Sequence, residues 1–580
     1  MSSKSTFKTP IKHATLQRNA FDLSRRDIFS VNAGELTPVC FIEVNPNEHF
    51  EIRPDIFLRT QTMNTAAYAR AKQKIEFFFV PYRALWSKSD QFFTGSNYTA
   101  SSIFNQVVPT GAPRFPLTPS TTNSNPACSF YSSLVNWYKQ GNHSAWTDIF
   151  GSDSLPQIRK LMDMMGYGLI DWNGIGTPSA AGSAVVGQYA TPFRALAYQK
   201  IYQDFYRLPL YEPYDNACNI DDLQGTSAKD QITLSVTDDN IKRLFTPRYH
   251  SWKYDYFTNV RAQSTLYMSL WMSDMSTPQS FSSLNLSSSV LYPISGKDGV
   301  LLRSPVEGDN TIYQSAISIR ALFALERMLD SMSRAKDGTY SAQIEARFGV
   351  KPLIDPHLSS TYLGGSDAPV VIGEVTSTAQ TSDVAGETSG DLGRVAGKGT
   401  SQSKQDVITF SSKEHGLIVG IFSIIPEAEY NAMGIDPMVQ KFQKEDYFTP
   451  ELDKLGFAPV TMKQLFAYGT GVPYGNDDKV VGFNPMYSEY KTAVDKVHGD
   501  FVQGGSLSAW CTPRMKGDVS NILNSDINSG FSLRFLKINP SVMDSIFAVS
   551  RTQADQFLVN CWLDIRAIRP MSVNGLPYCN

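Results

Sequence analysis

The segment that most resembles a phosphate-binding loop is GRVAGKGT, which spans Gly393–Thr400. A Walker A loop places four residues between its two glycines and a Ser or Thr directly after the lysine. Here three residues separate the glycines, and Gly399 follows Lys398. The segment also lies in a stretch rich in Ser, Thr and Gly that has neither strand nor helix periodicity. The sequence therefore does not predict a nucleotide-phosphate site.

Histidines and paired carboxylates are the other candidates for catalysis or metal binding. The seven histidines are dispersed, and no H-E-x-x-H or G-x-S-x-G motif occurs. Asp355 and His357 flank Pro356, a pattern that a local turn explains better than a metal site. Glu427 and Glu429 could form a pair for glycoside cleavage, but a chain with 55 acidic residues contains such pairs by chance. We expect no enzyme activity, no metal site and no cofactor.

Positive charge is concentrated near the N-terminus of a slightly acidic chain. The net charge is −3, whereas residues 1–30 contain six cations against Asp22 and Asp27. The rest of the chain therefore carries about −7. Small and polar residues separate the lysines, and Phe7 could stack on an unpaired base. This pattern predicts a flexible basic arm whose DNA-contacting residues are Lys4, Lys8, Lys12, Arg18, Arg25 and Arg26.

The composition indicates a chain with much of its surface covered. Charged residues make up 18%, below the roughly 25% usual for soluble globular proteins, and aromatic residues make up 12%. The six cysteines contain no C-x-x-C pair, which favours buried thiols over a zinc site or a disulfide framework. No signal-peptide core or membrane-spanning stretch is visible. We therefore expect the chain to stay in the cytoplasm where it is made, without membrane contact.

Five segments have the composition of β-strands. In KIEFFFVPYRALWSK, Phe77, Phe78 and Phe79 place aromatic side chains on both faces of a strand over Lys72–Val80, which Pro81 ends. Such a strand must be covered on both sides. Strands near both ends of the chain predict one β-domain that the two ends close. The other predicted strands are Leu36–Val44, His49–Met63, His415–Pro426 and Gln556–Pro570.

Helices and loops are predicted between these strands. A Thr-Pro start signal at 191–192 precedes apolar residues one turn apart, which predicts an amphipathic helix with a core stripe of Phe193, Ala197, Ile201 and Phe205. The stretch ISIRALFALERMLDSM predicts a second such helix at 317–332. Ser273–Ser289 and Thr376–Gln405, which are rich in Ser, Thr and Gly, are predicted to be surface loops.

Ten short blocks along the chain occur in an order typical of one family. They are RNAFDLS, GELTPV, KIEFFFVPYRALW, ALAYQKIYQDFYR, WKYDYFT, YLGG, EHGLIVGIFSIIP, NPMYSEYKTAVDKVHGDF, LKINPSVMDSIF and DQFLVNCWLDIRAI. Together they resemble the major capsid proteins of the Microviridae, the small tailless single-stranded-DNA bacteriophages. The chain is more similar to the gokushovirus and Bacteroidetes-prophage branches than to the branch with separate spike and external scaffolding proteins. The resemblance covers Arg18 to about Met571.

The resemblance implies a mainly β fold, an eight-stranded antiparallel jelly roll of the viral capsid type with long helix- and loop-containing insertions. Residues 1–30 would form the basic arm, and residues 31–580 a single jelly-roll domain. The insertions would lie at about 87–250, 261–314 and 373–406. The strand Lys72–Val80 would pack one face against the opposing sheet and the other against the insertions. Tyr82, Leu85 and Trp86 would lead into the first insertion.

The implied function is structural. The chain would self-assemble into an icosahedral shell around a circular single-stranded DNA genome, as part of a virion assembled in the cytoplasm of a host bacterium. Its partners would be other copies of itself, the packaged DNA, minor DNA-binding and pilot proteins, and a host surface receptor. The family's protrusion corresponds to 261–314, where we predict a host-contact loop with Ser276, Gln279, Phe281 and Asn285.

Two other classes of function remain as alternatives. A secreted β-sandwich that binds carbohydrate or cleaves glycosides would need a signal peptide and a cleft with paired carboxylates. A stand-alone nucleic-acid-binding protein would need a basic face beyond the arm. The absence of a signal-peptide core and the net charge of −3 disfavour these two alternatives.

Overall fold

The structure is a computed structural model of the chain. It describes residues 18–64, 67–94, 111–116, 147–152, 154–168, 189–208, 211–213, 215, 218–223, 238–260, 279–280, 311–312, 344–345, 348–350, 359–376, 395–404, 407–431, 434–450, 453, 457–465, 480–502, 505–511, 531–549, 551 and 554–573. The helix predicted at 317–332 and the Asp355–His357 pair lie outside these residues.

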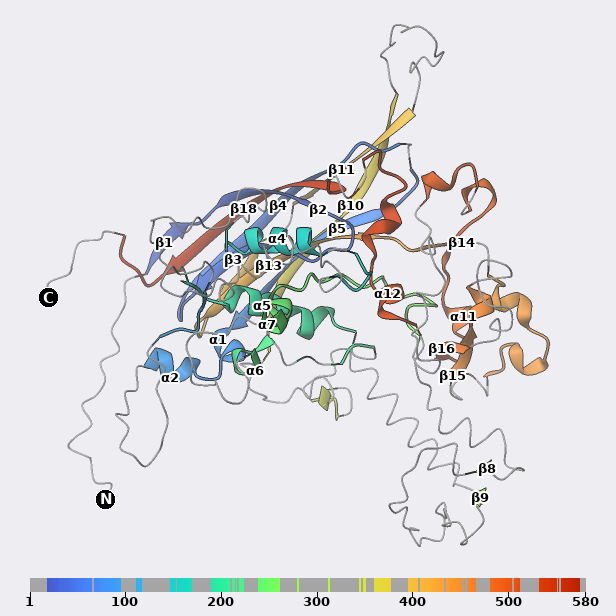
Figure 1. Cartoon of the computed structure of the whole chain (residues 1–580), viewed down its shortest axis with the longest axis horizontal. Coiled ribbons are helices and arrows are strands. Elements are labelled where there is room, and N and C mark those ends of the chain that lie inside the picture. Colours follow the sequence, from blue (N-terminus) through green and yellow to red (C-terminus); the bar gives the residue numbers. More distant parts are fainter. Residues whose placement is uncertain are drawn as a thin grey trace, which may run out of the picture.

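The main strands form one curled antiparallel sheet in the order β1-β18-β4-β11-β10-β5-β13-β3 (Figure 1). Two further strands join it, because β2 pairs with β18 and β12 pairs with β4. With helical insertions, this arrangement is consistent with a jelly roll and confirms the mainly β prediction. The bounds are β1 Asn19–Asp22, β2 Arg25–Val31, β3 Thr37–Val44, β4 His49–Thr60, β5 Ala71–Pro81, β10 Thr361–Thr376, β11 Val395–Lys404, β12 Ile408–Ser411, β13 Gly416–Pro426 and β18 Phe557–Arg569.

Strand β10 joins the two halves of the curled sheet. Its first part, through Val370, pairs with β5, and its last part, from Val371, pairs with β11. Strands β1 and β2 both pair with β18, so the two ends of the chain meet in one sheet, as predicted. In β4 and β18 buried and exposed side chains alternate, because one face of each strand covers the core.

Strand β5 is buried on both faces, as its aromatic run predicted. Phe77 and Phe79 lie in the core between the two halves of the sheet, together with side chains of β4 and β18. Phe78 and Val80 belong to a second core, which β5 and β13 share with the helices. At the end of the strand, Tyr82, Leu85 and Trp86 are buried in this second core and have a packing role.

Short helices cover the β5–β13 side of the sheet (Figure 1). In α5, residues 195–201 are all buried, so this helix is enclosed rather than amphipathic. The chain continues as a π-helix over Tyr202–Tyr206, and Phe205 is partly exposed although the periodicity placed it in the core stripe. The wider π turn rotates later side chains away from a 3.6-residue period. The α-helices among the described residues, on this side and elsewhere, are α1 Tyr82–Leu85, α2 Ser89–Thr94, α4 Leu155–Met164, α5 Phe193–Ile201, α6 Ile220–Leu223, α7 Asp238–Phe245, α11 Ser488–Lys491 and α12 Leu533–Leu536.

The prediction that Thr376–Gln405 is a surface loop is wrong for its second half. Residues 395–404 form β11, which lies between β10 and β4 in the sheet. The small residues that suggested a loop allow β11 to pack closely against its neighbouring strands. A Cβ atom on Gly399 would lie 2.6 Å from the Thr60 Cγ2 atom, and the Gly399 amide donates to Thr60 Oγ1 at 2.7 Å. The strands on either side therefore impose the conformation on a sequence of low β propensity.

A smaller module lies at the opposite end of the long axis from β1 (Figure 1). It contains the parallel pair β14 Glu429–Asn431 and β17 Asp495–Val497 and the antiparallel pair β15 Phe457–Thr461 and β16 Val480–Pro485. Its own core includes Tyr430, Val460, Val481 and Phe531. Two short pairs lie elsewhere, β6 Phe115–Pro116 with β7 Tyr189–Ala190 and β8 Gln279–Ser280 with β9 Thr311–Ile312.

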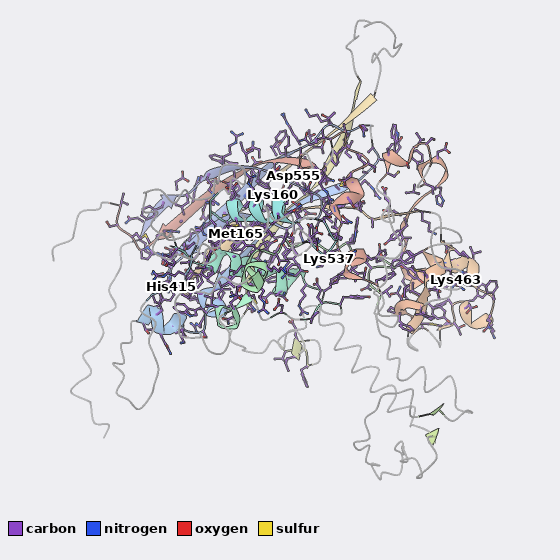
Figure 2. The ribbon with its side chains drawn as sticks, in the orientation of Figure 1. Lys160, Met165, His415, Lys463, Lys537 and Asp555 are labelled. Carbon is purple, nitrogen blue, oxygen red and sulfur yellow. The ribbon has the colours of Figure 1, made fainter. Side chains whose placement is uncertain are left out.

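A network of ion pairs and hydrogen bonds joins α4 to residues near the two ends of the sequence. Lys160 on α4 contacts the Glu35 carboxylate at 2.5 Å and the Asp555 carboxylate at 3.2 Å. Figure 2 labels Lys160 and Asp555 next to each other. Burial alone would raise the pKa of Asp555, but Lys160 and hydrogen bonds from Ser30 and Asn32 hold it below its usual value. The network therefore connects a helix of the first insertion to residues that flank β2 and β18.

We expect Phe77→Ala to destabilise the subunit by about 3–5 kcal/mol, because it removes an aromatic ring from the core between the two halves of the sheet. The matched control is Ile28→Ala on β2, where the side chain is 69% exposed and the cost should stay within about 0.5 kcal/mol. Urea denaturation of the isolated subunit measures both. Equal shifts for the two variants would contradict the assignment of Phe77 to the main core.

We expect Asp555→Asn to destabilise the subunit at pH 7 by about 2–4 kcal/mol, because Lys160 loses a carboxylate in a largely buried site. A carboxyl whose folded pKa is lowered stabilises the fold above its unfolded pKa and loses that contribution as pH falls through the folded value. The difference between variant and wild type should therefore shrink below about pH 3.8.

The matched control is Asp453→Asn, which removes the partner of the more exposed Lys491 at 2.6 Å and should cost less than about 1 kcal/mol. Denaturation midpoints at pH 7 and pH 3 measure these effects. A difference between Asp555→Asn and wild type that is the same at the two pH values would contradict the proposed role of the carboxylate.

Candidate functional site

The structure describes three of the six predicted DNA-contacting residues. Arg18 is exposed just before β1, and Arg25 and Arg26 are exposed on β2. Strands β1 and β2 thus lie within the 1–30 segment expected to be an arm, and they are fixed to β18 by backbone pairing. Lys4, Lys8 and Lys12 lie outside the described residues. The contact of all six residues with DNA stays a prediction.

Arg25 and Arg26 line a groove of about 360 Å³, which we call the β2 groove. Two residues that the sequence analysis did not single out, Arg194 on α5 and Phe41 on β3, also line it. The Arg194 guanidinium lies over the Phe41 ring at 5.5 Å. No motif marks this arrangement, because packing of α5 against the sheet brings Arg194 to β2. The other lining residues are Asp27, Ile28, Phe29, Val39, Asp163, Met164 and Gly166.

Each of the three guanidinium groups of the β2 groove bonds to an uncharged acceptor. Arg26 Nε donates to Asn560 Oδ1 at 2.7 Å, and Arg194 donates to the Met165 carbonyl at 2.9 Å. Arg25 donates to the Val39 carbonyl at 3.3 Å and also pairs with the Asp27 carboxylate at 3.1 Å. Arginine presents five N–H donors and suits phosphate geometry, so a groove with such groups can bind an anion such as a phosphate.

The solvent-facing side of β18 next to this groove carries exposed apolar residues. Trp562, which is 48% exposed, pairs with Arg26 across the strands, and Leu558 is exposed on the same face. Period-two alternation along β18 would have identified both as outward-facing. The charges on the neighbouring positions balance, since Arg53 pairs with Asp564 and Glu51 with Arg566. Exposed apolar side chains of this kind are suited to contact with protein.

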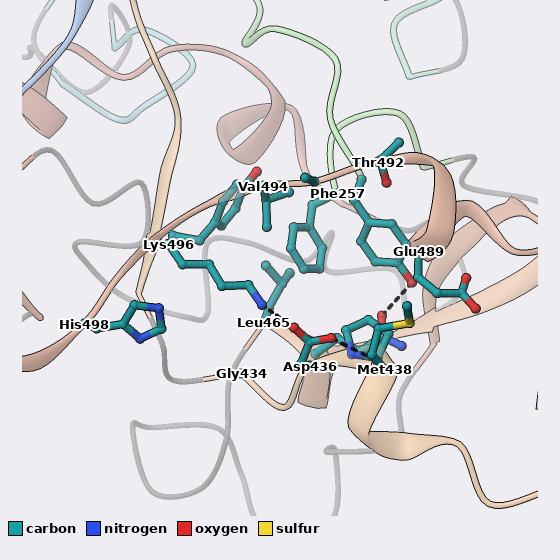
Figure 3. A pocket seen from close by; sticks show the side chains of 15 residues that line it. Phe257, Gly434, Asp436, Met438, Leu465, Glu489, Thr492, Val494, Lys496 and His498 are labelled. Carbon is teal, nitrogen blue, oxygen red and sulfur yellow. Dashed lines mark hydrogen bonds and ion pairs between the residues drawn. The ribbon is translucent and has the colours of Figure 1, made fainter. Parts of the chain in front are cut away.

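A larger pocket of about 610 Å³ lies in the smaller module (Figure 3). Tyr256, Phe257 and Tyr430 form its aromatic part. The Asp436 carboxylate forms an ion pair with Lys496, and a hydrogen bond from Lys496 together with one from the Met438 amide lowers the pKa of Asp436.

The other carboxylate of this pocket, Glu489, accepts from Lys441 at 2.9 Å. Asp436, with its lowered pKa, is a poor general acid, and Glu489 is engaged in an ion pair, so neither is arranged as the acid of a glycoside hydrolase. Glu427 and Glu429, the pair considered for glycoside cleavage, are no better suited to act as a general acid, because Glu427 forms an ion pair with Arg70 at 3.0 Å.

The described part of the chain was found to contain neither a metal-ligand cluster nor a membrane-spanning helix. Among those residues no group of His, Cys, Asp and Glu could hold a metal ion, and no helix is long and apolar enough to cross a membrane. Cys40, Cys218, Cys511 and Cys561 are buried and form no disulfide, as predicted for these four. Burial raises the pKa of the Cys40 thiol to about 11, so it is a packing residue rather than a nucleophile.

The predicted host-contact residues are mostly outside the described residues. Gln279 begins β8, whose pairing with β9 brings together two positions of the 261–314 interval. Ser276, Phe281 and Asn285 are outside the part that the structure describes. The role of this interval in host contact therefore stays a prediction.

Comparison with known proteins identifies viral capsid proteins as relatives of this chain. A family model described as "Capsid protein (F protein)" matches residues 9–139 and 170–579. The chain is 22% identical to the capsid protein VP1 of Chlamydia phage 1, over 97% of this chain and 96% of that protein. It is 20% identical to the capsid protein VP1 of Bdellovibrio phage phiMH2K, over 98% and 96%. The chain therefore belongs to the capsid protein (F protein) family of the Microviridae and is a major capsid protein of these small single-stranded-DNA phages.

Proposed function

We propose that this capsid protein builds an icosahedral shell around a circular single-stranded DNA, with its basic N-terminal residues and the β2 groove facing the genome. The groove carries the proposal, because the Arg26 and Arg194 guanidinium groups bond to uncharged acceptors and can each neutralise a phosphate. The cations from Lys4 to Arg18 precede β1 directly, and β1 pairs with the same strand, β18, as the groove's β2.

Further partners follow from the family resemblance. We propose minor DNA-binding and pilot proteins within the virion and a receptor on the host surface. The insertion at 261–314 would lie on the outer surface and contact this receptor. Placement of the chain within the Bacteroidetes-prophage branch is also a prediction, since the relatives named above come from Chlamydia and Bdellovibrio phages.

We expect particles in which Lys4, Lys8, Lys12 and Arg18 are replaced by Gln to form but to package poorly. Six contacts at about 0.7 each give a log-log slope of single-stranded-DNA binding against salt no steeper than about −4, and the variant should flatten it by up to about 3. Arg25→Gln with Arg26→Gln should flatten it by about 1.4. Salt titration of DNA binding and the DNA content of purified particles measure these effects.

The control for this experiment replaces the exposed Lys72, Lys253, Lys398 and Lys413 by Gln. It removes the same charge from other surfaces, so packaging should be retained. If the N-terminal residues instead run beneath neighbouring subunits and touch only protein, the N-terminal variant will keep its DNA content. Unchanged DNA content or an outward-facing arm would reject the genome contact.

Removal of residues 273–289 should spare particle formation and lower adsorption to host cells, because an exposed loop tolerates change and carries recognition. A matched variant that keeps the length but replaces the segment by Gly and Ser should also lose adsorption, since it lacks the side chains of Ser276, Gln279, Phe281 and Asn285. Adsorption assays with purified virions measure both variants. Wild-type adsorption by either variant would rule out the receptor role.

A further inference from the structure

An ordered apolar projection lies on the smaller module. It comprises Pro437–Phe448, which we call the 437–448 knob. Its large side chains point to solvent, and Phe442 and Val439 are 86% and 71% exposed. Met438, Tyr447 and Phe448 are exposed as well. Single exposed apolar residues are common on soluble monomers, but five large ones clustered in one short segment are not.

Polar contacts beneath the surface hold the backbone of the knob in place. Asp436 accepts a hydrogen bond from the Met438 amide at 2.9 Å and begins a 3-10 turn. The Asp446 carboxylate accepts from the Phe442 and Gln443 amides at 2.9 and 2.8 Å. Phe442 is therefore exposed on a defined turn rather than on a loop without internal bonds.

The polarity of the knob is inverted relative to an ordinary surface segment. The Lys441 side chain is only 6% exposed and donates to Glu489 and to the Asp446 carbonyl, both at 2.9 Å. Its ammonium lies 3.8 Å from the centre of the Tyr490 ring on α11. The chain thus turns a lysine inward and the adjacent phenylalanine outward, although water favours the reverse. Such an arrangement is expected where a partner covers the phenylalanine.

We propose that the 437–448 knob is a subunit contact, and that a second copy of this chain covers Phe442 and Val439. The inference rests on the assembly of copies into a shell, which supplies neighbours at high local concentration. The knob has two lysines and two acidic residues in sequence, so it carries no net charge that would repel an identical copy or attract DNA. It belongs to the module at the opposite end of the long axis from β1, where a neighbouring subunit can reach it (Figure 1).

The test compares Phe442→Ser and Phe442→Leu with wild type in particle formation, measured by sedimentation and electron microscopy of the expressed chain. We expect Phe442→Ser to lower the association of subunits by about tenfold or more, as loss of an aromatic contact does at an interface, and Phe442→Leu to retain most of it. The thermal midpoint of the isolated subunit should not change, because the side chain makes little contact within its own chain. Val371→Ser, at another exposed apolar position far along the sequence on β10, is the matched control and should assemble.

A photoreactive phenylalanine analogue at position 442 identifies what covers the knob. Illumination of assembled particles should give a covalent dimer, and the cross-linked peptide locates the acceptor surface on the second copy. Wild-type assembly by Phe442→Ser, or cross-links only to DNA, to lipid or within one chain, would overturn the proposal. These outcomes leave the capsid function intact, whereas a wild-type chain that forms no particles at all would count against assembly itself.

Discussion

The double burial of β5 is the constraint on which the rest of the structure depends. From Ile75 to Pro81 every residue of β5 is buried, and most are large and apolar, so this part of the strand needs a sheet on one face and a further layer on the other. Phe77 and Phe79 fill the space between the two halves of the sheet. On the other face, the centres of the Phe78 ring and of the Phe205 ring in the helical insertion are 4.8 Å apart. One strand thereby anchors both the jelly roll and the helices inserted into it.

Buried charge fixes the insertions where apolar packing alone would leave their position loosely defined. Lys160 joins α4 to Glu35 and Asp555. Asp204 of the π-helix, which pairs with Lys200 one turn earlier at 3.1 Å, accepts from the Ser360 amide just before β10 at 2.9 Å. Lys537 is 1% exposed and donates to the Tyr206 carbonyl at 2.8 Å, at the end of the π-helix. Burial lowers its pKa to about 8. Each of these ions costs desolvation, so each contact favours one arrangement of its helix over its alternatives.

The surface shows the reverse arrangement. Large apolar side chains are exposed there, at positions where a charged side chain would be better solvated. Trp562 and Leu558 project from the outer face of β18, and Phe442 projects from the smaller module. A low charged fraction in the sequence agrees with this distribution. For a capsid subunit, whose surface is shared among neighbours and genome, exposed apolar area on a single chain is area available for assembly.

The sequence by itself determined the strands with strong patterns and the family. β3, β4, β5, β13 and β18 were predictable because alternation or continuous apolar runs reflect burial directly, and ten ordered blocks specified the capsid family. Only the tertiary structure decided that Val395–Lys404 is a strand, since its Gly and Ser residues gain their conformation from pairing with β4 and β10. The tertiary structure also places Arg25 and Arg26 on a paired strand beside Arg194. The sequence could not show this, because contacts between distant residues leave no local periodicity. The π-helix that leaves Phe205 partly exposed and the inward position of Lys441 could not be predicted either, because each depends on hydrogen-bond geometry that side-chain types do not encode.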